Sequence, residues 1–248
     1  GQTTGTVLVA LTDDALNELS ETLILTMGSP TNARLGNVTT HTLTITDNDP
    51  LPRVSFTADT QRVTEGDGPI LVTVQLSAPS GLEVRVPITY SGTSSQGTDY
   101  TTTVNEVVFP AGTTTVSFPI TIINDNISER TETLLIRLGT PINAIAPASP
   151  DSPNVQAIVI TDDEPLRTLA FNSTGRQVSE TAGTIEFDAV LSGPVDEDVT
   201  VAFTISGTAT PGVDYVLETP SPRTIPAGQT STRIRLRVIN DNLFEGTI

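Results

Sequence analysis

The sequence repeats a set of acidic residues about every 115 positions, and this period constrains the fold more than any other feature. Three pairs of acids are separated by 115 residues: Glu65 and Glu180, Asp99 and Asp214, and Asp47 and Asp162. A constant spacing between fixed residues is typical of an array of one repeated structural unit. The 248 residues therefore hold slightly more than two units, each of ordinary domain size.

Alignment of the copies predicts three segments, which we call repeats one, two and three. Repeat one is the C-terminal half of a unit (residues 1–50), repeat two is complete (51–165), and repeat three is the N-terminal part of a unit (166–248). Prolines in the linkers at 49–53 and 164–167 predict stiff joints. The partial repeats would leave sheet edges open, so we expect either that the natural chain continues on both sides or that a neighbouring molecule donates the missing strands.

Apolar residues alternate with polar ones, which predicts β-strands. In the segment 70–76, for example, Ile70, Val72, Val74 and Leu76 share one face. Thr and Val, which suit a pleated surface, dominate throughout, and helical periodicity is missing. We therefore predict an all-β fold: tandem immunoglobulin-like antiparallel β-sandwiches with about seven strands per repeat.

The composition excludes several classes of partner and site. The formal net charge is −17, and all 12 basic residues are arginines. Because nucleic acids and anionic membranes attract cationic surfaces, we expect no nucleic-acid partner. No apolar run is long enough to predict membrane insertion. The absence of cysteine excludes disulfides and thiolate metal sites.

Eight carboxylates of repeat two lie in four segments where predicted strands end. They are Glu65, Asp99, Asp125, Glu129, Glu132, Asp162, Asp163 and Glu164. Loops at one end of an antiparallel sandwich converge, so we expect these side chains to gather in a small volume. Two like charges 4 Å apart repel by about 1 kcal/mol in water, and by more where they are partly buried. Such a cluster predicts a bound cation.

Calcium is the cation that this set of ligands favours, since it accepts roughly six to eight oxygens in flexible geometry. Magnesium needs tighter octahedral geometry, and zinc prefers histidine or cysteine. Eight acids are too many for one ion, so we expect two or more. The alternative is an acidic surface that only keeps the protein soluble.

The other repeats carry corresponding acids, and we predict that these also bind metal. In repeat one they are Asp14, Glu18, Glu21, Asp47 and Asp49. In repeat three they are Glu180, Asp214, Asp241 and Glu245.

These motifs together resemble the Calx-β family, the calcium-binding repeat of sodium–calcium exchanger sensor domains, an integrin subunit and long bacterial surface proteins. The matching motifs of repeat two are Glu65-Gly66, Gly97–Tyr100, Pro110–Gly112, Ile123–Glu132 and Thr161–Glu164. Repeat three continues the series with Glu180, Gly212–Tyr215, Pro226–Gly228 and Ile239–Glu245. The resemblance implies that the eight acids of repeat two stand where the exchanger domains hold calcium.

The chain departs from the family pattern at several positions. Asn124 and Asn240 replace an acid that is common in the sensor copies, and Asn48 replaces the central acid of the first terminal cluster. Glu180 lacks the glycine that follows Glu65. Lost charge should lower affinity or ion number. Cadherins are a rival resemblance through Asp47-Asn48-Asp49-Pro50, but their other acidic motifs are missing.

The remaining polar residues do not suggest catalysis. His41 is the only histidine, and we interpret it as a solvent-facing strand residue. Without cysteine, it forms no repeated nucleophile–base arrangement, so we predict that the protein is not an enzyme. Arg233, Arg235 and Arg237 predict a basic stripe on one strand, either solvated or in contact with an acidic neighbour or an anionic polysaccharide.

We therefore predict non-catalytic structural repeats of a large extracellular or cell-surface, adhesin-like protein, in which calcium stiffens the joints. The expected partners are flanking repeats of the same chain and an unidentified surface or matrix ligand, with neighbouring copies in an assembly as a further option. The alternative from another class is a regulatory calcium sensor of a membrane transporter or receptor.

Overall fold

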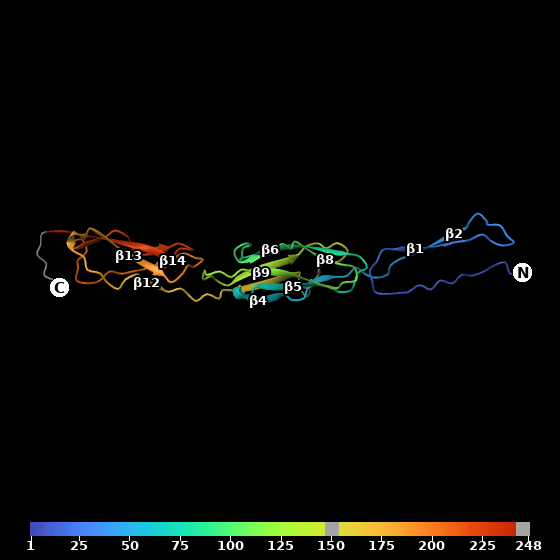
Figure 1. Cartoon of the computed structure of the whole chain (residues 1–248), viewed down its shortest axis with the longest axis horizontal. Helices are drawn as coiled ribbons and strands as arrows, with labels where there is room; N and C mark the ends of the chain where they lie inside the picture. The colour runs from blue at the N-terminus through green and yellow to red at the C-terminus, as the bar shows by residue number, and fades with distance from the viewer. Residues whose placement is uncertain (147–153, 242–248) are drawn as a thin grey trace. The chain divides into compact units, whose positions relative to one another are not determined.

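The computed structural model describes residues 1–146 and 154–241 (Figure 1). The chain divides into two compact units. Unit 1 comprises residues 1–63, 67–122 and 133–159, and unit 2 comprises 64–66, 123–132 and 160–248. The described elements are strands and two short 3₁₀ helices, η1 (Glu65–Asp67) and η2 (Glu180–Ala182). The predicted all-β fold is confirmed.

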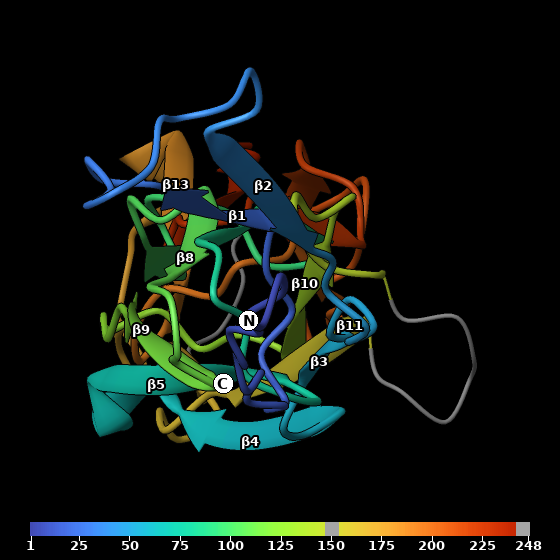
Figure 2. The same ribbon diagram turned by 90° about the vertical axis from the view of Figure 1, so that its right-hand side faces the viewer.

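Repeat two forms a β-sandwich whose body lies in unit 1. Its four-stranded sheet has the order β3 (Val54–Phe56), β5 (Pro69–Leu76), β9 (Thr115–Ile122) and β7 (Tyr100–Thr101). Its five-stranded sheet has the order β4 (Thr60–Thr64), β11 (Val155–Thr161), β10 (Glu132–Leu138), β6 (Val84–Gly92) and β8 (Glu106–Phe109). Figure 2 labels β5 and β9 of the first sheet, and β8 and β10 of the second.

The core of this sandwich follows the predicted alternation. In β5, Ile70, Val72, Val74 and Leu76 are all buried, whereas the residues between them are exposed or half-buried. The antiparallel pairing of β5 with β9 sets Val72 opposite Phe118, which is also buried. The apolar face of each sheet is therefore turned to the interior, which is what drives two sheets together.

Repeat one contributes a hairpin to unit 1. Strand β1 (Glu21–Thr26) pairs with β2 (Thr40–Ile45) in antiparallel register, with Leu23 opposite Leu43. His41 is exposed on β2, as predicted. The apolar residues of this hairpin are half-buried or exposed.

Repeat three forms two smaller sheets in unit 2. One has the order β12 (Leu169–Phe171), β13 (Thr184–Leu191), β17 (Ser231–Val238) and β15 (Tyr215–Leu217). The other pairs β14 (Val199–Val201) with β16 (Arg223–Ile225). The buried cluster between them includes Ala189, Leu191, Val201 and Ile225.

The basic stripe on β17 is paired with acids of neighbouring strands. Arg233 contacts Asp188 and Glu186, Arg235 contacts Glu186, and Arg237 contacts Glu218. These side chains are half-exposed, so the ladder adds little stability per pair. The predicted basic stripe is therefore one side of a row of cross-strand ion pairs.

Candidate metal centre

Glu65 is the most deeply buried carboxylate of the predicted site. It begins η1, directly after β4, and only 6% of its surface is exposed. Burial, together with the negative charges of Glu129, Asp162, Asp125 and Glu164, raises the pKa of Glu65 to about 7. A buried carboxylate is costly unless a donor or a cation compensates its charge.

Two acids from the end of β11 join Glu65. One carboxylate oxygen each of Glu65, Asp163 and Glu164 lie within 4.8 Å of one another. Burial, hydrogen bonding to Asp162 and the nearby charges of Asp163 and Asp162 raise the pKa of Glu164. The protein alone thus disfavours the fully ionised cluster.

Two carboxylate oxygens at the end of β11 are buried and accept no hydrogen bond. They are Oδ1 of Asp162 and Oε2 of Glu164. The other oxygen of Asp162 accepts a long hydrogen bond from the Ser128 hydroxyl, at 3.4 Å. Orphaned carboxylate oxygens in a cluster made only of oxygen ligands fit a hard cation such as Ca²⁺.

Gly66 provides room for this cluster. A Cβ built at Gly66 would lie 2.9 Å from Oδ2 of Asp163 and 3.6 Å from the side-chain amide nitrogen of Asn124. Any larger residue would therefore displace Asp163. The space that Asp163 needs explains the glycine of the Glu-Gly motif, and the sequence pattern alone did not predict this reason.

The loop at 123–132 contributes Asp125, Glu129 and Glu132 to the predicted site. Oδ1 of Asp125 accepts the Ile127 backbone N–H at 2.6 Å, which closes a tight turn before Ser128. Asp14 accepts the Leu16 N–H in the same way in repeat one, at 2.9 Å. The aspartate at this position therefore shapes the loop as well as supplying charge. Glu129 and Glu132 follow this turn.

Asp99 and Asp214 occupy equivalent turns. Asp99 accepts the Ser95 N–H at 2.5 Å, and Asp214 accepts the Thr210 N–H at 2.6 Å. The glycines two positions earlier have positive φ, +97° at Gly97 and +80° at Gly212, a conformation that glycine adopts without strain. The Gly-x-Asp-Tyr motif thus builds a turn, and a ligand role for its aspartates stays a prediction.

The acids of repeat one also come together. Asp13, Asp14, Glu18, Glu21, Asp47 and Asp49 line one cavity of about 380 Å³. Burial and neighbouring carboxylates raise the pKa of both Glu18 and Asp49. Asn17 donates to Asp47 Oδ2 at 3.0 Å and to the Asp49 carbonyl at 2.9 Å. This arrangement repeats the crowding of repeat two without a counterpart of Glu65.

Repeat three has a less complete set. Glu180 is exposed in η2, followed by Thr181 in place of the glycine. Asp241 is the last described residue, and Glu245 lies outside the described residues.

One backbone bridge connects each acidic loop to the next repeat. The sequence patterns did not predict these two bridges. Asn17, directly before Glu18, forms a parallel bridge with Ser80, and Ser128, directly before Glu129, forms one with Val195. The Gly81 N–H donates to the Asn17 carbonyl at 3.0 Å, and the Asp196 N–H donates to the Ser128 carbonyl at 3.3 Å.

The second joint has additional contacts. The Arg167 guanidinium donates to the carbonyls of Asn126 and Pro194 and lies against Gly193. Arg130 forms an exposed ion pair with Glu197 at 2.6 Å. Arg167 thus connects the acidic loop to the loop between β13 and β14 of repeat three.

The Pro-Ala-Gly motif supports the loop that holds Ser80 or Val195, to which the preceding repeat bridges. The Gly112 N–H donates to the Ser80 carbonyl at 2.7 Å, and the Gly228 N–H donates to the Val195 carbonyl at 2.8 Å. Both glycines have positive φ, +78° and +73°. The motif therefore holds the loop that receives the preceding repeat.

Comparison with known proteins places the chain in a family. The Calx-beta domain model matches three times, at residues 1–49, 47–164 and 162–247. The chain belongs to the Calx-beta family. Calx-beta domains bind calcium and form a family of binding or regulatory domains.

The chain is similar to segments of larger proteins. It is 26% identical to adhesion G-protein coupled receptor V1 of Danio rerio, over 97% of this chain and 4% of that protein. It is 26% identical to sodium/calcium exchanger 1 of Rattus norvegicus (81% of this chain, 22% of that protein) and 25% identical to extracellular matrix organizing protein FRAS1 of Mus musculus (98% and 6%). The chain thus spans only a small part of these relatives.

Solved Calx-beta domains are also similar. The crystal structure of CBD12 from CALX1.2 has a TM-score of 0.42 and 24% identity, over 77% of this chain and 76% of that one.

Among the described residues of the present chain, no helix has the length and apolar character needed to cross a bilayer.

Proposed function

We propose that this chain is a set of calcium-binding structural repeats of a large extracellular or cell-surface protein, in which Ca²⁺ stiffens the joints between sandwiches. The observation that carries the proposal is the position of the acidic loops. In both joints, the residue that bridges to the next repeat directly precedes an acid of the cluster: Asn17 before Glu18, and Ser128 before Glu129. An ion that orders the acids would also order the bridge.

Within repeat two, Glu65, Asp163 and Glu164 would form the centre of a calcium site, with Asp162 and the acids of the loop at 123–132 completing it. A bound Ca²⁺ supplies positive charge to oxygens that otherwise repel one another. The protein's part is to hold the oxygens close: Gly66 leaves space for Asp163, and burial keeps water from screening Glu65.

Calcium binding would also stabilise the fold by linkage. If the ion binds only the folded state, with a dissociation constant near 10 μM in about 1 mM calcium, each independent site adds roughly 2.7 kcal/mol to the free energy of unfolding. In an array of the proposed repeats 1–50, 51–165 and 166–248, the same ions would limit bending at each joint.

Spin-label distances test the stiffening. The chain has no cysteine, so exposed Thr89 and Thr200 can be replaced by cysteine and labelled without other changes. We expect a narrow distance distribution in calcium and a broad one in chelator. Asp163→Asn should broaden the distribution in calcium, whereas Glu83→Gln, an exposed acid paired with Arg85, should not. Equal widths with and without calcium would refute the proposal.

The similarity to sodium/calcium exchanger 1 favours a second candidate, a regulatory calcium sensor. Affinity separates the two functions. Calorimetry that gives submicromolar dissociation constants supports the sensor, and values of tens of micromolar or weaker support the structural role. The adhesion receptor and matrix relatives, together with the short linkers, make the structural role the one we propose.

A further inference from the structure

Asn17 and Ser128 occupy equivalent places in the two joints. The backbone of Asn17 bridges to Ser80, and the backbone of Ser128 bridges to Val195. Neither side chain is fully exposed: Asn17 is half-buried, and only 7% of Ser128 is accessible. These side chains have a second set of contacts, which the backbone bridge does not require.

The side chain of each bridging residue binds the same atom of an equivalent aspartate. The amide nitrogen of Asn17 donates to Oδ2 of Asp47 at 3.0 Å, and the hydroxyl of Ser128 donates to Oδ2 of Asp162 at 3.4 Å. Asp47 and Asp162 are 115 residues apart and belong to the predicted metal sites of their repeats. Two different residue types thus make the same connection in two copies.

This hydrogen bond leaves the second oxygen of Asp162 for a cation. Oδ1 of Asp162 is buried and accepts no hydrogen bond from the described residues. Because a carboxylate is planar, an ion bound to Oδ1 would also restrain Oδ2, and Oδ2 restrains the Ser128 hydroxyl. The aspartate therefore lies between the proposed ion and the bridging residue.

The peptide group of the same residue continues the connection to the next repeat. The Asn17 carbonyl accepts the Gly81 N–H at 3.0 Å, and the Ser128 carbonyl accepts the Asp196 N–H at 3.3 Å. Few rotatable bonds separate the side-chain donor of a serine or an asparagine from its own carbonyl. A restraint on the side chain therefore also restrains the bridge.

The backbone bridge is common to both joints, but the side-chain connection differs in strength. Asn17 makes a second hydrogen bond, to the Asp49 carbonyl at 2.9 Å. The bond from Ser128 to Asp162 is longer than either of these, and a hydroxyl has only one proton to donate. Asparagine thus connects the bridge to the acids more firmly than serine does.

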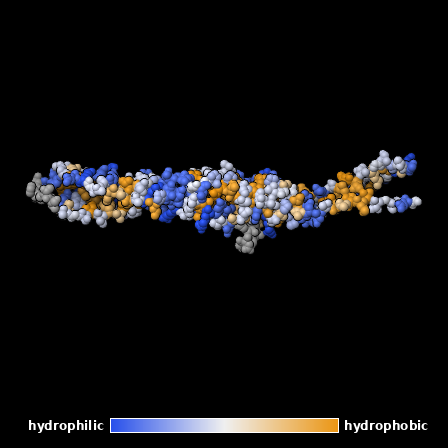
Figure 3. All heavy atoms as spheres, turned by 60° about the horizontal axis from the view of Figure 1, so that its bottom comes forward, coloured by the Kyte–Doolittle hydropathy of each residue, from blue (hydrophilic) through white to orange (hydrophobic). Residues whose placement is uncertain are grey.

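The second joint also has contacts that do not pass through a carboxylate. Arg167 donates to the carbonyls of Asn126 and Pro194. Hydrophilic residues, blue in Figure 3, cover much of the surface of this stretch of the chain, so hydrogen bonds are the main contacts available to orient it. The contribution of Arg167 should therefore be similar with and without calcium.

We infer that Asn17 and Ser128 are positioning residues that transmit calcium binding to the joints. Each holds an aspartate of the acidic cluster with its side chain and the next repeat with its peptide group. The inference rests on the proposed stiffening by calcium and names the residue through which it acts. The residue type at this position then sets how far calcium stiffens a joint: asparagine gives strong coupling, and serine gives weak coupling.

Substitutions at position 128 test this in the full chain labelled at positions 89 and 200. Ser128→Ala keeps every carboxylate and the peptide bridge but removes the hydroxyl. Calcium should still bind, with an affinity lowered by about fivefold or less, the scale of one hydrogen bond. The narrowing of the distance distribution in calcium should be lost. Ser128→Asn should narrow the distribution more than serine does, because it can reproduce the contacts of Asn17.

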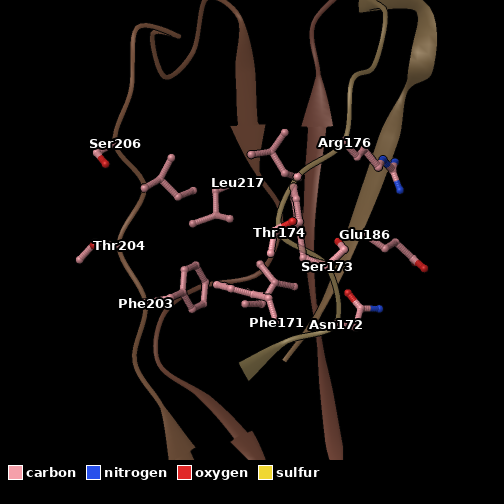
Figure 4. A pocket seen from close by; sticks show the side chains of 15 residues that line it. Phe171, Asn172, Ser173, Thr174, Arg176, Glu186, Phe203, Thr204, Ser206 and Leu217 are labelled. Atoms are coloured by element: carbon pink, nitrogen blue, oxygen red, sulfur yellow. The ribbon is translucent and has the colours of Figure 1, made fainter. Parts of the chain in front are cut away.

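Ser206→Ala is the matched control. Ser206 is an exposed serine of unit 2 that lines a separate cavity of about 480 Å³ (Figure 4). This variant should change neither the calcium affinity nor the distance distribution. In chelator, the alanine, serine and asparagine forms at position 128 should show the same broad distribution, which separates a calcium-dependent role from a purely structural one.

Each alternative result has a distinct meaning. If Ser128→Ala narrows in calcium as much as the original chain, or if Ser128→Asn narrows no more than Ser128→Ala, the inference is overturned. Loss of measurable calcium binding in Ser128→Ala would also overturn it, since Ser128 would then belong to the ion site itself. Equal widths with and without calcium in the original chain would instead refute the proposed function, and the inference with it.

Discussion

The carboxylate of Asp163 occupies the space beside Gly66: a Cβ at Gly66 would lie 2.9 Å from it. The end of the eleventh strand thus lies close to the end of the fourth, at the place where Glu65 is buried. The smallest side chain is therefore part of the candidate calcium site, although it offers no ligand atom.

Gly66→Ala should weaken calcium binding. The added methyl group would push Asp163 away from Glu65 and Glu164, and we expect a loss of about tenfold in affinity, which corresponds to about 1.4 kcal/mol. Isothermal titration calorimetry on the whole chain measures this change. Gly36→Ala is the matched control, because a Cβ there meets nothing within 4 Å. An unchanged affinity in Gly66→Ala would mean that Asp163 is not a ligand.

Glu65→Gln should have opposite effects with and without calcium. The amide keeps the shape of the side chain but removes a buried negative charge, so in chelator the melting temperature should rise. In calcium the variant should lose most of the stabilisation that the original chain gains. Thermal unfolding followed by circular dichroism gives both values, with Glu106→Gln, an acid already paired with Arg85, as the control. A fall in melting temperature under both conditions contradicts this account.

Stability in chelator should decrease as pH rises. The pKa of Glu65 is raised from 4.5 to about 7 in the folded protein, so the folded state binds this proton more tightly than the unfolded state. The corresponding stability is fully present below pH 4.5 and is lost as pH rises through about 7. Urea unfolding at pH 5 to pH 8 should show this decline, reduced in Glu65→Gln.

Calcium affinity should show the reverse trend with pH. Because the ion must displace the proton on Glu65, affinity should fall by up to about tenfold for each pH unit below 7. Calorimetry in two buffers of different ionisation enthalpy would detect the released proton. Binding without proton release at pH 6.5 would remove Glu65 from the ligand set.

Arg167→Ala should loosen the joint without unfolding either sandwich. The variant loses the guanidinium contacts to Asn126 and Pro194, each worth about 1 kcal/mol. The distance distribution between labels at positions 89 and 200 should broaden even in calcium, while the circular dichroism spectrum stays the same. Arg62→Ala removes an exposed arginine and is the control.

Much of the fold was predictable because the hydrophobic pattern has period two. Ile70, Val72, Val74 and Leu76 could be assigned to one buried face from their spacing alone, and the structure confirms the assignment. The convergence of Glu65 with Asp163 and Glu164, separated by about one hundred residues, was predictable because loops at one end of an antiparallel sandwich converge.

Other features could not be predicted, since they depend on backbone geometry. The bridge between Ser128 and Val195 uses main-chain groups, and its counterpart has Asn17 and Ser80 at the same places, so no side-chain pattern marks it. The motif aspartates Asp99 and Asp214 looked like simple ligands, but each also closes its own turn with a hydrogen bond. The sequence shows which residues are charged, and only the folded loop shows which groups their side chains face.

The main-chain character of the two bridges has an evolutionary consequence. Asn and Ser serve equally well on one side, and Ser and Val on the other, because the hydrogen bonds run between peptide groups. A duplicated copy can therefore form this main-chain bridge at both of its ends without compensating substitutions at the bridging positions. Arrays built in this way can lengthen or shorten by whole copies while the bridging residues themselves diverge.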